Sequence, residues 1–130
     1  MPDRRRISSQ SPWEDLVGYS RAVRVRNVVY VSGTTATDSE GRILGGDNPY
    51  KQAKHVLEKI GRALQEAGGS IHDVVRTRIY VTNIDNWQQV GRAHREVFGD
   101  IKPATTMVEV ARLISAYVLV EIEAEAVVDP

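Results

Sequence analysis

The stretch that decides the fold reads Pro103-Ala104-Thr105-Thr106-Met107-Val108-Glu109-Val110-Ala111-Arg112-Leu113. Its side chains alternate as they do in a half-buried strand, which predicts Val108 and Val110 on one face. The opposite face then carries Thr105, Met107 and Glu109. The initial proline stops any preceding helix and gives the strand an extended entry. We therefore interpret the polar face of this strand as one wall of a ligand cleft.

Length and composition indicate a folded domain and exclude several classes of protein. The 130 residues are 42% hydrophobic, enough for a real core, and roughly two thirds of the unfolded surface is buried in a domain of this size. Lys+Arg and Asp+Glu balance at 17 each, so the chain lacks the basic excess of a general nucleic-acid binder. It contains no cysteine, which excludes disulfides, a thiol nucleophile and a thiolate metal site.

The N-terminal residues are expected to lie outside the domain. Residues 1–12 are polar, and the run Arg4-Arg5-Arg6 is typical of a solvated tail. No apolar segment follows these arginines, so they do not form a secretory signal. No apolar run approaches the ~20 residues of a membrane span either. We therefore expect a flexible tail at 1–12, a single domain at 13–130 and a cytoplasmic location without membrane contact.

The remaining elements follow from periodicity and from turn and capping residues. Asn48 and Pro49 are a good N-cap and first helical residue, and Gly68-Gly69 ends the helix they begin. Besides the opening strand, the pattern predicts strands at 21–25, 28–32, 75–81 and 117–128, and helices at 48–67 and 86–98. The order β-β-α-β-α-β-β predicts an α+β fold with two helices on one face of the sheet.

The other face of the sheet is predicted to be strongly polar. Its expected members, besides the polar residues of the opening stretch, are Arg76, Arg78, Tyr80, Glu121, Glu123 and Glu125. One explanation is exposure to solvent, which is common for one face of such a sheet. The alternative is an oligomer whose subunits close these faces around a shared interior, where Arg and Glu pair across strands.

Several short motifs share their spacing with a known family. They are Ser32-Gly33, Gln52-Ala53, Ala67-Gly68, Asp73-Val74-Val75, Pro103-Ala104, Val108-Glu109-Val110-Ala111-Arg112-Leu113 and Glu121-Ile122-Glu123-Ala124. Together they resemble the Rid family, also called YjgF and once labelled L-PSP endoribonuclease, over residues 17–128. The resemblance implies a chorismate-mutase-like fold, a homotrimer with inward-facing sheets, and small-molecule clefts between subunits. It also implies hydrolysis of reactive enamines and imines to keto acids and ammonia, with no metal or organic cofactor.

The resemblance also implies roles for particular residues. Glu121 matches the glutamate that activates the attacking water, and Tyr19 matches a tyrosine of active members; both are the predicted catalytic residues. Ser32, Gly33 and Thr34 match the base of the cleft and are predicted to bind substrate. Glu121 lies nine residues after Arg112, one more than the family pattern. A bulge or longer turn must absorb the extra residue, or Glu123 takes the place of Glu121.

The main departure from the family is at Thr105. Deaminating members have an arginine immediately after Pro-Ala, which grips the substrate carboxylate in a bidentate pair. Thr105 offers a single hydroxyl, and losing a charged hydrogen bond costs roughly 1.5–3 kcal/mol. Thr105, Thr106 and Met107 are still the predicted substrate-binding residues of this strand. Either the substrate lacks a carboxylate, or another cation reaches the cleft; the candidates are Arg21, Arg76 and Arg78.

Three functions are compatible with these residues. The leading one is an imine or enamine hydrolase with altered substrate preference. The alternative is a non-catalytic trimeric protein that binds a metabolite, which the missing arginine favours. Ribonuclease activity is suggested only by the older family label, and neutral charge and few aromatic residues give it little support. His94 lies on the apolar stripe of the second helix, which favours a core or interface role over catalysis.

Overall fold

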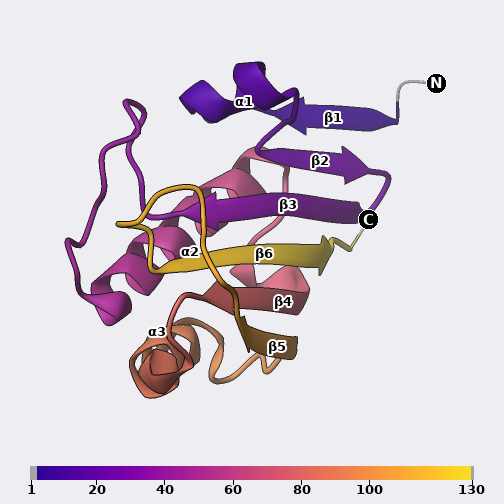
Figure 1. Cartoon of the computed structure of the whole chain (residues 1–130). Coiled ribbons are helices and arrows are strands. Elements are labelled where there is room, and N and C mark those ends of the chain that lie inside the picture. Colours follow the sequence, from indigo (N-terminus) through magenta and orange to yellow (C-terminus); the bar gives the residue numbers. More distant parts are fainter. Residues whose placement is uncertain (1–2, 130) are drawn as a thin grey trace.

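Six strands form a single sheet, and helices α2 and α3 cover one of its faces (Figure 1). The computed structural model describes residues 3–129. The strands are β1 (Arg4–Ile7), β2 (Ala22–Val25), β3 (Val28–Thr35), β4 (Val74–Val81), β5 (Ala104–Glu109) and β6 (Val120–Val127). The helices are α1 (Pro12–Val17), α2 (Pro49–Glu66) and α3 (Trp87–Phe98), with single 3-10 turns at Ile71–Asp73 and Ile84–Asn86. No helix in the described range is both long and apolar enough to cross a bilayer.

The strand order is β1-β2-β3-β6-β4-β5. Only β4 and β5 run parallel, with α3 as their crossover, and every other neighbouring pair is antiparallel. The predicted α+β fold with two helices on one face is thus confirmed. The core lies between that face and the helices, where Val56, Ile60 and Leu64 of α2 are fully buried. The predicted cap is also present, since the Asn48 side chain accepts a hydrogen bond from the Lys51 amide at 3.0 Å.

The expected flexible tail is wrong for residues 4–12. Arg4–Ile7 forms strand β1, which pairs antiparallel with β2 from Arg4↔Val25 to Ile7↔Ala22. Ile7 is buried and joins the core, and Arg5 donates a hydrogen bond to the Glu66 carbonyl at 2.7 Å. Helix α1 follows, with Ser11 as its N-cap. A run of three arginines hides this strand from pattern analysis, because only Ile7 contributes apolar burial. Met1 and Pro2 lie outside the described residues.

The predicted faces of the opening strand are reversed. Strand β5 pairs with β4 so that Thr105 lies beside Thr77 and Met107 beside Ile79, both on the helix-covered face. Thr105 Oγ1 is 2.8 Å from Thr77 Oγ1, and Met107 packs against the core. Val108, predicted to be buried, is exposed on the open face. Because side chains alternate with a period of two, a wrong choice of face inverts every residue of the strand. Strand β5 is a mostly exposed edge strand, so its alternation does not indicate which face the helices cover.

The open face of the sheet carries the predicted rows of charges. Arg78 bonds Glu125 at 3.0 Å and lies 3.5 Å from Glu123, while the Tyr80 hydroxyl donates to Glu123 at 3.0 Å. These pairs cross from β4 to β6 within the single chain. Burial, followed by the hydrogen bond that its hydroxyl donates to Glu123, raises the pKa of Tyr80. The hydrogen bond that Arg78 donates to Glu125 raises the pKa of Arg78.

Gln52 connects α2 to the segment that leads into β6. Its side chain is fully buried, and its amide nitrogen donates to the carbonyls of Gly46 at 2.7 Å and Tyr117 at 2.9 Å. Its amide oxygen accepts a hydrogen bond from Leu119 N at 2.9 Å. All three hydrogen bonds go to backbone groups in irregular segments, which have no partner in a strand or helix. Gln52 therefore fixes the position of the loop between β5 and β6, residues 110–119.

Substitution Gln52→Leu is expected to lower the free energy of unfolding by roughly 2–4 kcal/mol, because it leaves three backbone groups without their partner. Urea unfolding followed by circular dichroism measures this loss. Gln65→Leu is the matched control, since Gln65 is exposed on the same helix. Equal stability of the two variants would show that water replaces Gln52 at no cost.

Candidate functional site

A cleft of about 710 Å³ opens at the end of the sheet beside α1. Its size falls within the range of small-molecule sites. It is built by α1, the residues just before β2, the second half of β3 with the segment after it, one residue of α2, the loop 110–119 and the start of β6. The lining residues are Ser11, Trp13, Val17, Tyr19, Arg21, Ser32, Gly33, Thr35, Thr37, Lys59, Arg112, Leu113, Ile114, Glu121 and Glu123.

A bulge in β3 forms the floor of the cleft. Val31 pairs with Ala124 and Thr34 with Ile122, so Ser32 and Gly33 together oppose the single residue Glu123. Such bulges bend a strand and redirect its side chains, and they are frequent beside active sites. The Glu121 carboxylate lies directly over Gly33, where a β-carbon would overlap its Oε2. Glycine thus makes room for the acid on the neighbouring strand.

Glu121 is the carboxylate of the cleft that is free to act on a ligand. Burial raises its pKa; the charge of Arg21 opposes this shift and that of Glu123 adds to it. Within residues 3–129 no group donates a hydrogen bond to its carboxylate, whereas Glu123 is engaged by Tyr80 and Arg78. The pairing of β6 with β4 is continuous from Val120 to Glu125, so the extra residue before Glu121 is accommodated in the loop 110–119. Both glutamates face the cleft.

Arg21 organises the side of the cleft next to β3. It is only 5% exposed, and its guanidinium donates to the Gly33 carbonyl at 2.9 Å and to Thr34 Oγ1 at 2.7 Å. It also donates to the Tyr19 hydroxyl at 3.2 Å, which leaves the Tyr19 proton available to a ligand. Its Nε lies 3.6 Å from Glu14 Oε2. Arg21 therefore holds the bulge and Tyr19 in place.

Glu14 on α1 is the buried counterion of Arg21. It accepts hydrogen bonds from the Ser8 hydroxyl at 3.0 Å, from the Ser9 amide and from the Ser9 hydroxyl. Burial alone would raise the pKa of Glu14, but these hydrogen bonds and the charge of Arg21 outweigh it and leave the pKa below its ordinary value. The segment predicted to be a tail thus supplies one support of the cleft.

Lys59 is a second cation at the cleft, and it is half-buried. Its amino group donates to the carbonyls of Thr35 at 2.6 Å and Thr37 at 2.9 Å. Burial, followed by the charges of Arg21 and Arg62, lowers the pKa of Lys59 to about 8. Arg21 and Lys59 also border a smaller hollow of about 360 Å³ under the N-terminal segment. Sequence patterns gave Lys59 no role because only long-range folding brings α2 beside the end of β3.

The predicted site residues divide into two groups. Tyr19, Ser32, Gly33 and Glu121 lie together in the cleft, and Thr34 is fully buried beneath it as a partner of Arg21. Thr105 and Met107 face the helices, and Thr106 is on the open face of β5; all three lie outside the cleft of the single chain. Strand β5 is separated from β3 by β6 and β4, so the role of these three residues in a cleft between subunits stays a prediction.

His94 has the structural environment that its apolar stripe suggested. Its Nε2 is 2.9 Å from Thr77 Oγ1, and its ring contacts that of Phe98 with centroids 4.6 Å apart. Burial lowers the pKa of His94, which favours the neutral ring. The chain His94–Thr77–Thr105 connects α3 through β4 to β5.

The fold and cleft define a small α+β protein with an acid beside a strand bulge, and comparison with known proteins identifies its family. The model of the endoribonuclease L-PSP family matches residues 10–128. The chain therefore belongs to the Rid family, also known as the YjgF or L-PSP family.

Individual relatives agree with this assignment. The crystal structure of Rv2704 from Mycobacterium tuberculosis, a member of the YjgF/YER057c/UK114 family, is 49% identical with a TM-score of 0.88, covering 96% of this chain and 99% of Rv2704. A RutC family protein of Pyrococcus abyssi is 40% identical over 83% of this chain and 84% of its own length. Escherichia coli TdcF, solved with bound serine, is 26% identical with a TM-score of 0.77, covering 85% of this chain and 88% of TdcF.

Proposed function

We propose that this protein hydrolyses imines or enamines of small metabolites, with a substrate preference that differs from that of the family's arginine-bearing deaminases. The observation that carries the proposal is the Glu121 carboxylate, which has a raised pKa and lies over Gly33 in a cleft of small-molecule size. An acid with a pKa nearer to neutrality exchanges protons effectively at physiological pH.

The reaction needs one water and no redox step. The water oxygen attacks the carbon of C=N, giving a carbinolamine; loss of ammonia from that carbon then leaves the carbonyl compound. In our proposal Glu121 takes a proton from the attacking water and delivers it to the imine nitrogen. As the carbinolamine breaks down, Glu121 takes the proton of its hydroxyl group and delivers it to the same nitrogen, which leaves as ammonia. Tyr19 donates from its hydroxyl to the ligand or the water. Ser32 donates its own proton to the Ser20 carbonyl at 2.7 Å, so its oxygen can accept a hydrogen bond from the substrate nitrogen.

The bound serine of TdcF supports a small amino-acid-like ligand for this fold. Serine is similar in size and polar groups to the 2-imino acids, which are oxidised or dehydrated forms of amino acids. The cleft of this chain, at about 710 Å³, has room for a molecule of that size or larger.

Release of ammonia from a panel of freshly generated imines tests the proposal. The panel contains 2-imino acids with small and large side chains and imines that lack a carboxylate. We expect turnover of at least one member above that of a Glu121→Gln variant, with formation of one carbonyl product per ammonia. Equal rates for the two proteins across the panel would reject hydrolysis.

A second candidate function is binding of a metabolite without turnover. It is favoured by Thr105, because this residue has no charge to hold a substrate carboxylate and its hydroxyl is hydrogen-bonded to that of Thr77. In this case a panel compound binds saturably and is recovered unchanged from the wild-type protein, which separates this function from hydrolysis.

We also propose a homotrimer in which the open faces of the sheets meet and neighbouring subunits complete the clefts. The open face carries a polar row and several half-exposed apolar side chains, including Tyr30, Val75 and Val108, which would be covered in such an assembly. Light scattering coupled to size exclusion is expected to give three times the chain mass of 14.5 kDa. A mass equal to that of one chain at micromolar concentration would contradict the trimer.

A further inference from the structure

We propose that Arg112 binds the carboxylate of the substrate, and that the substrate is a 2-imino acid with a branched or aromatic apolar side chain. The inference rests on the proposed function for the hydrolytic step, whereas carboxylate binding by Arg112 does not depend on turnover. It assigns to the loop 110–119 the anion recognition that β5 does not provide through Thr105.

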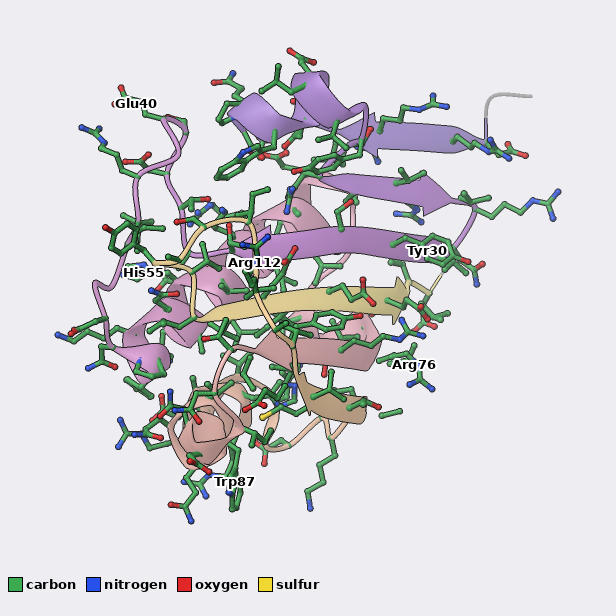
Figure 2. The ribbon with its side chains drawn as sticks, viewed as in Figure 1. Tyr30, Glu40, His55, Arg76, Trp87 and Arg112 are labelled. Atoms are coloured by element: carbon green, nitrogen blue, oxygen red, sulfur yellow. The ribbon has the colours of Figure 1, made fainter. Side chains whose placement is uncertain are left out.

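The guanidinium of Arg112 lies at the cleft and has N–H donors that are free to bind a ligand. It is exposed on the loop that crosses over β3 in Figure 2. Among the residues that the structure describes, no hydrogen bond or ion pair engages its side chain, although it lines the cleft together with Glu121. Arg21 is the contrasting case, because its two terminal nitrogens donate to Gly33, Thr34 and Tyr19. A free guanidinium offers two parallel N–H donors that match a carboxylate.

The other two candidate cations, Arg76 and Arg78, are also less suitable than Arg112. Arg78 is bound to Glu125 at 3.0 Å and to Glu123 at 3.5 Å, and Arg76 lies beside Ala104 and Glu125 in the sheet. Neither lines the cleft. The sequence pattern does not place Arg112 at the cleft, because the direction of its side chain depends on the course of an irregular loop.

The loop that carries Arg112 is anchored at both ends. Val110 N donates to the Val81 carbonyl at 2.8 Å, and Gln52 bonds Tyr117 and Leu119 near the other end. These anchors keep the guanidinium over the cleft without constraining its donors. A cation in this position also offsets the repulsion between a substrate carboxylate and Glu121, which shares the cleft.

The side-chain preference follows from the residues next to Arg112. Leu113 and Ile114 come directly after it and line the same cleft, with Trp13 and Val17 from α1. Ile114 is 62% exposed and Val17 is 72% exposed. An apolar substituent placed between them would be removed from water together with both side chains. A methyl group would fill little of this space, so larger side chains are favoured.

Isothermal titration calorimetry with three stable probes tests the inference. The probes are 4-methyl-2-oxopentanoate, its carboxylate-free analogue 4-methylpentan-2-one, and pyruvate. We expect the wild-type protein to bind the first at least ~10-fold more tightly than the ketone, which corresponds to one charged hydrogen bond. The branched side chain is expected to give a further ~10-fold preference over pyruvate. Arg112→Met should remove the preference over the ketone, and Arg112→Lys should keep part of it.

Controls separate this inference from the proposed function. Arg95→Met is the matched variant, since Arg95 is exposed on α3 outside the cleft, and it should bind all probes as the wild type does. Arg112→Met with an unchanged preference for the oxo acid over the ketone, or a wild type without that preference, overturns the inference. Oxo-acid binding that depends on Arg112 in a protein without turnover rejects only hydrolysis. Turnover of 2-imino acids with a KM unaffected by Arg112→Met rejects only the role of Arg112.

Discussion

Glu121→Gln is expected to lower kcat for imine hydrolysis by ~10²–10⁴-fold, the range that a positioned acid or base contributes. The amide matches the carboxylate in shape but cannot take a proton from water. Binding of the oxo-acid probe should persist, because the anion is held by a different residue. The stability of the variant should be equal to or above that of the wild type, because burial disfavours the charged form of Glu121.

The pH dependence gives a second readout of the same residue. Because the active form is the carboxylate, kcat/KM is expected to fall as the pH is lowered through the raised pKa of Glu121, above the ordinary value of 4.5. For stability the sign is opposite: the folded-state pKa lies above that of the unfolded chain, so the contribution of Glu121 declines as the pH rises between the two values. Steady-state rates measure the pH dependence of kcat/KM, and urea midpoints measure that of stability. A range of about pH 4–8 covers the region above typical carboxyl pKa values.

Two neighbouring glutamates serve as matched controls. Glu125→Gln alters the same row of β6 outside the cleft and should keep kcat. Glu123→Gln, within the cleft but bonded to Tyr80 and Arg78, should lower it far less than Glu121→Gln. A large loss for Glu123→Gln with near-normal activity of Glu121→Gln would transfer the acid–base role to Glu123.

Gly33→Ala is expected to lower kcat by ~10²-fold, since displacing a catalytic group by about 1 Å has an effect of this size. A methyl group there would overlap Glu121 Oε2. The flexible end of the glutamate gives way more easily than the bulged backbone. Gly33 has no positive φ, so alanine fits the backbone. The change in the free energy of unfolding should therefore be small, and kcat measured alongside urea unfolding separates the two effects.

Gly91→Ala is the matched glycine control. Nothing lies within 4 Å of the position that its β-carbon would take, and it is inside helix α3. The substitution should leave kcat unchanged and raise stability by up to ~1 kcal/mol through helix propensity. If Gly33→Ala also keeps full activity, the position of the Glu121 carboxylate over Gly33 is unimportant for the reaction.

Local signals were sufficient to predict most of the fold. The Asn48-Pro49 start of α2, the apolar stripes of α2 and α3, and the alternation of β4 and β6 are properties of contiguous residues, and the structure agrees with each. Strand β1 could not be predicted because only Ile7 of its four residues is apolar and buried, and its pairing with β2 is set by the fold. The prediction assigned the side chains of β5 to the wrong faces, because only the register of β5 with β4 determines which side chains face the helices.

Candidate site residues that belong to a short motif were predicted, whereas those that only tertiary contacts bring to the cleft were not. Ser32, Gly33 and Glu121 were found through the family spacing. Glu14 of α1, Arg21 just before β2 and Lys59 of α2 support the cleft, and no short motif connects these three segments. Arg112 belongs to a family motif, but its position in the same cleft as Glu121 depends on the loop that Gln52 anchors.

Strand β1 also affects how the protein behaves at high concentration. It is an edge of the sheet, and its exposed Arg4, Arg5 and Arg6 give that edge a high density of positive charge. A strand from another chain that added there would bring its backbone among these guanidinium groups, and an identical edge would add three more charges of the same sign. Charged side chains are a common protection of sheet edges against aggregation. The arginines thus favour association of copies through other surfaces and disfavour open-ended growth of the sheet.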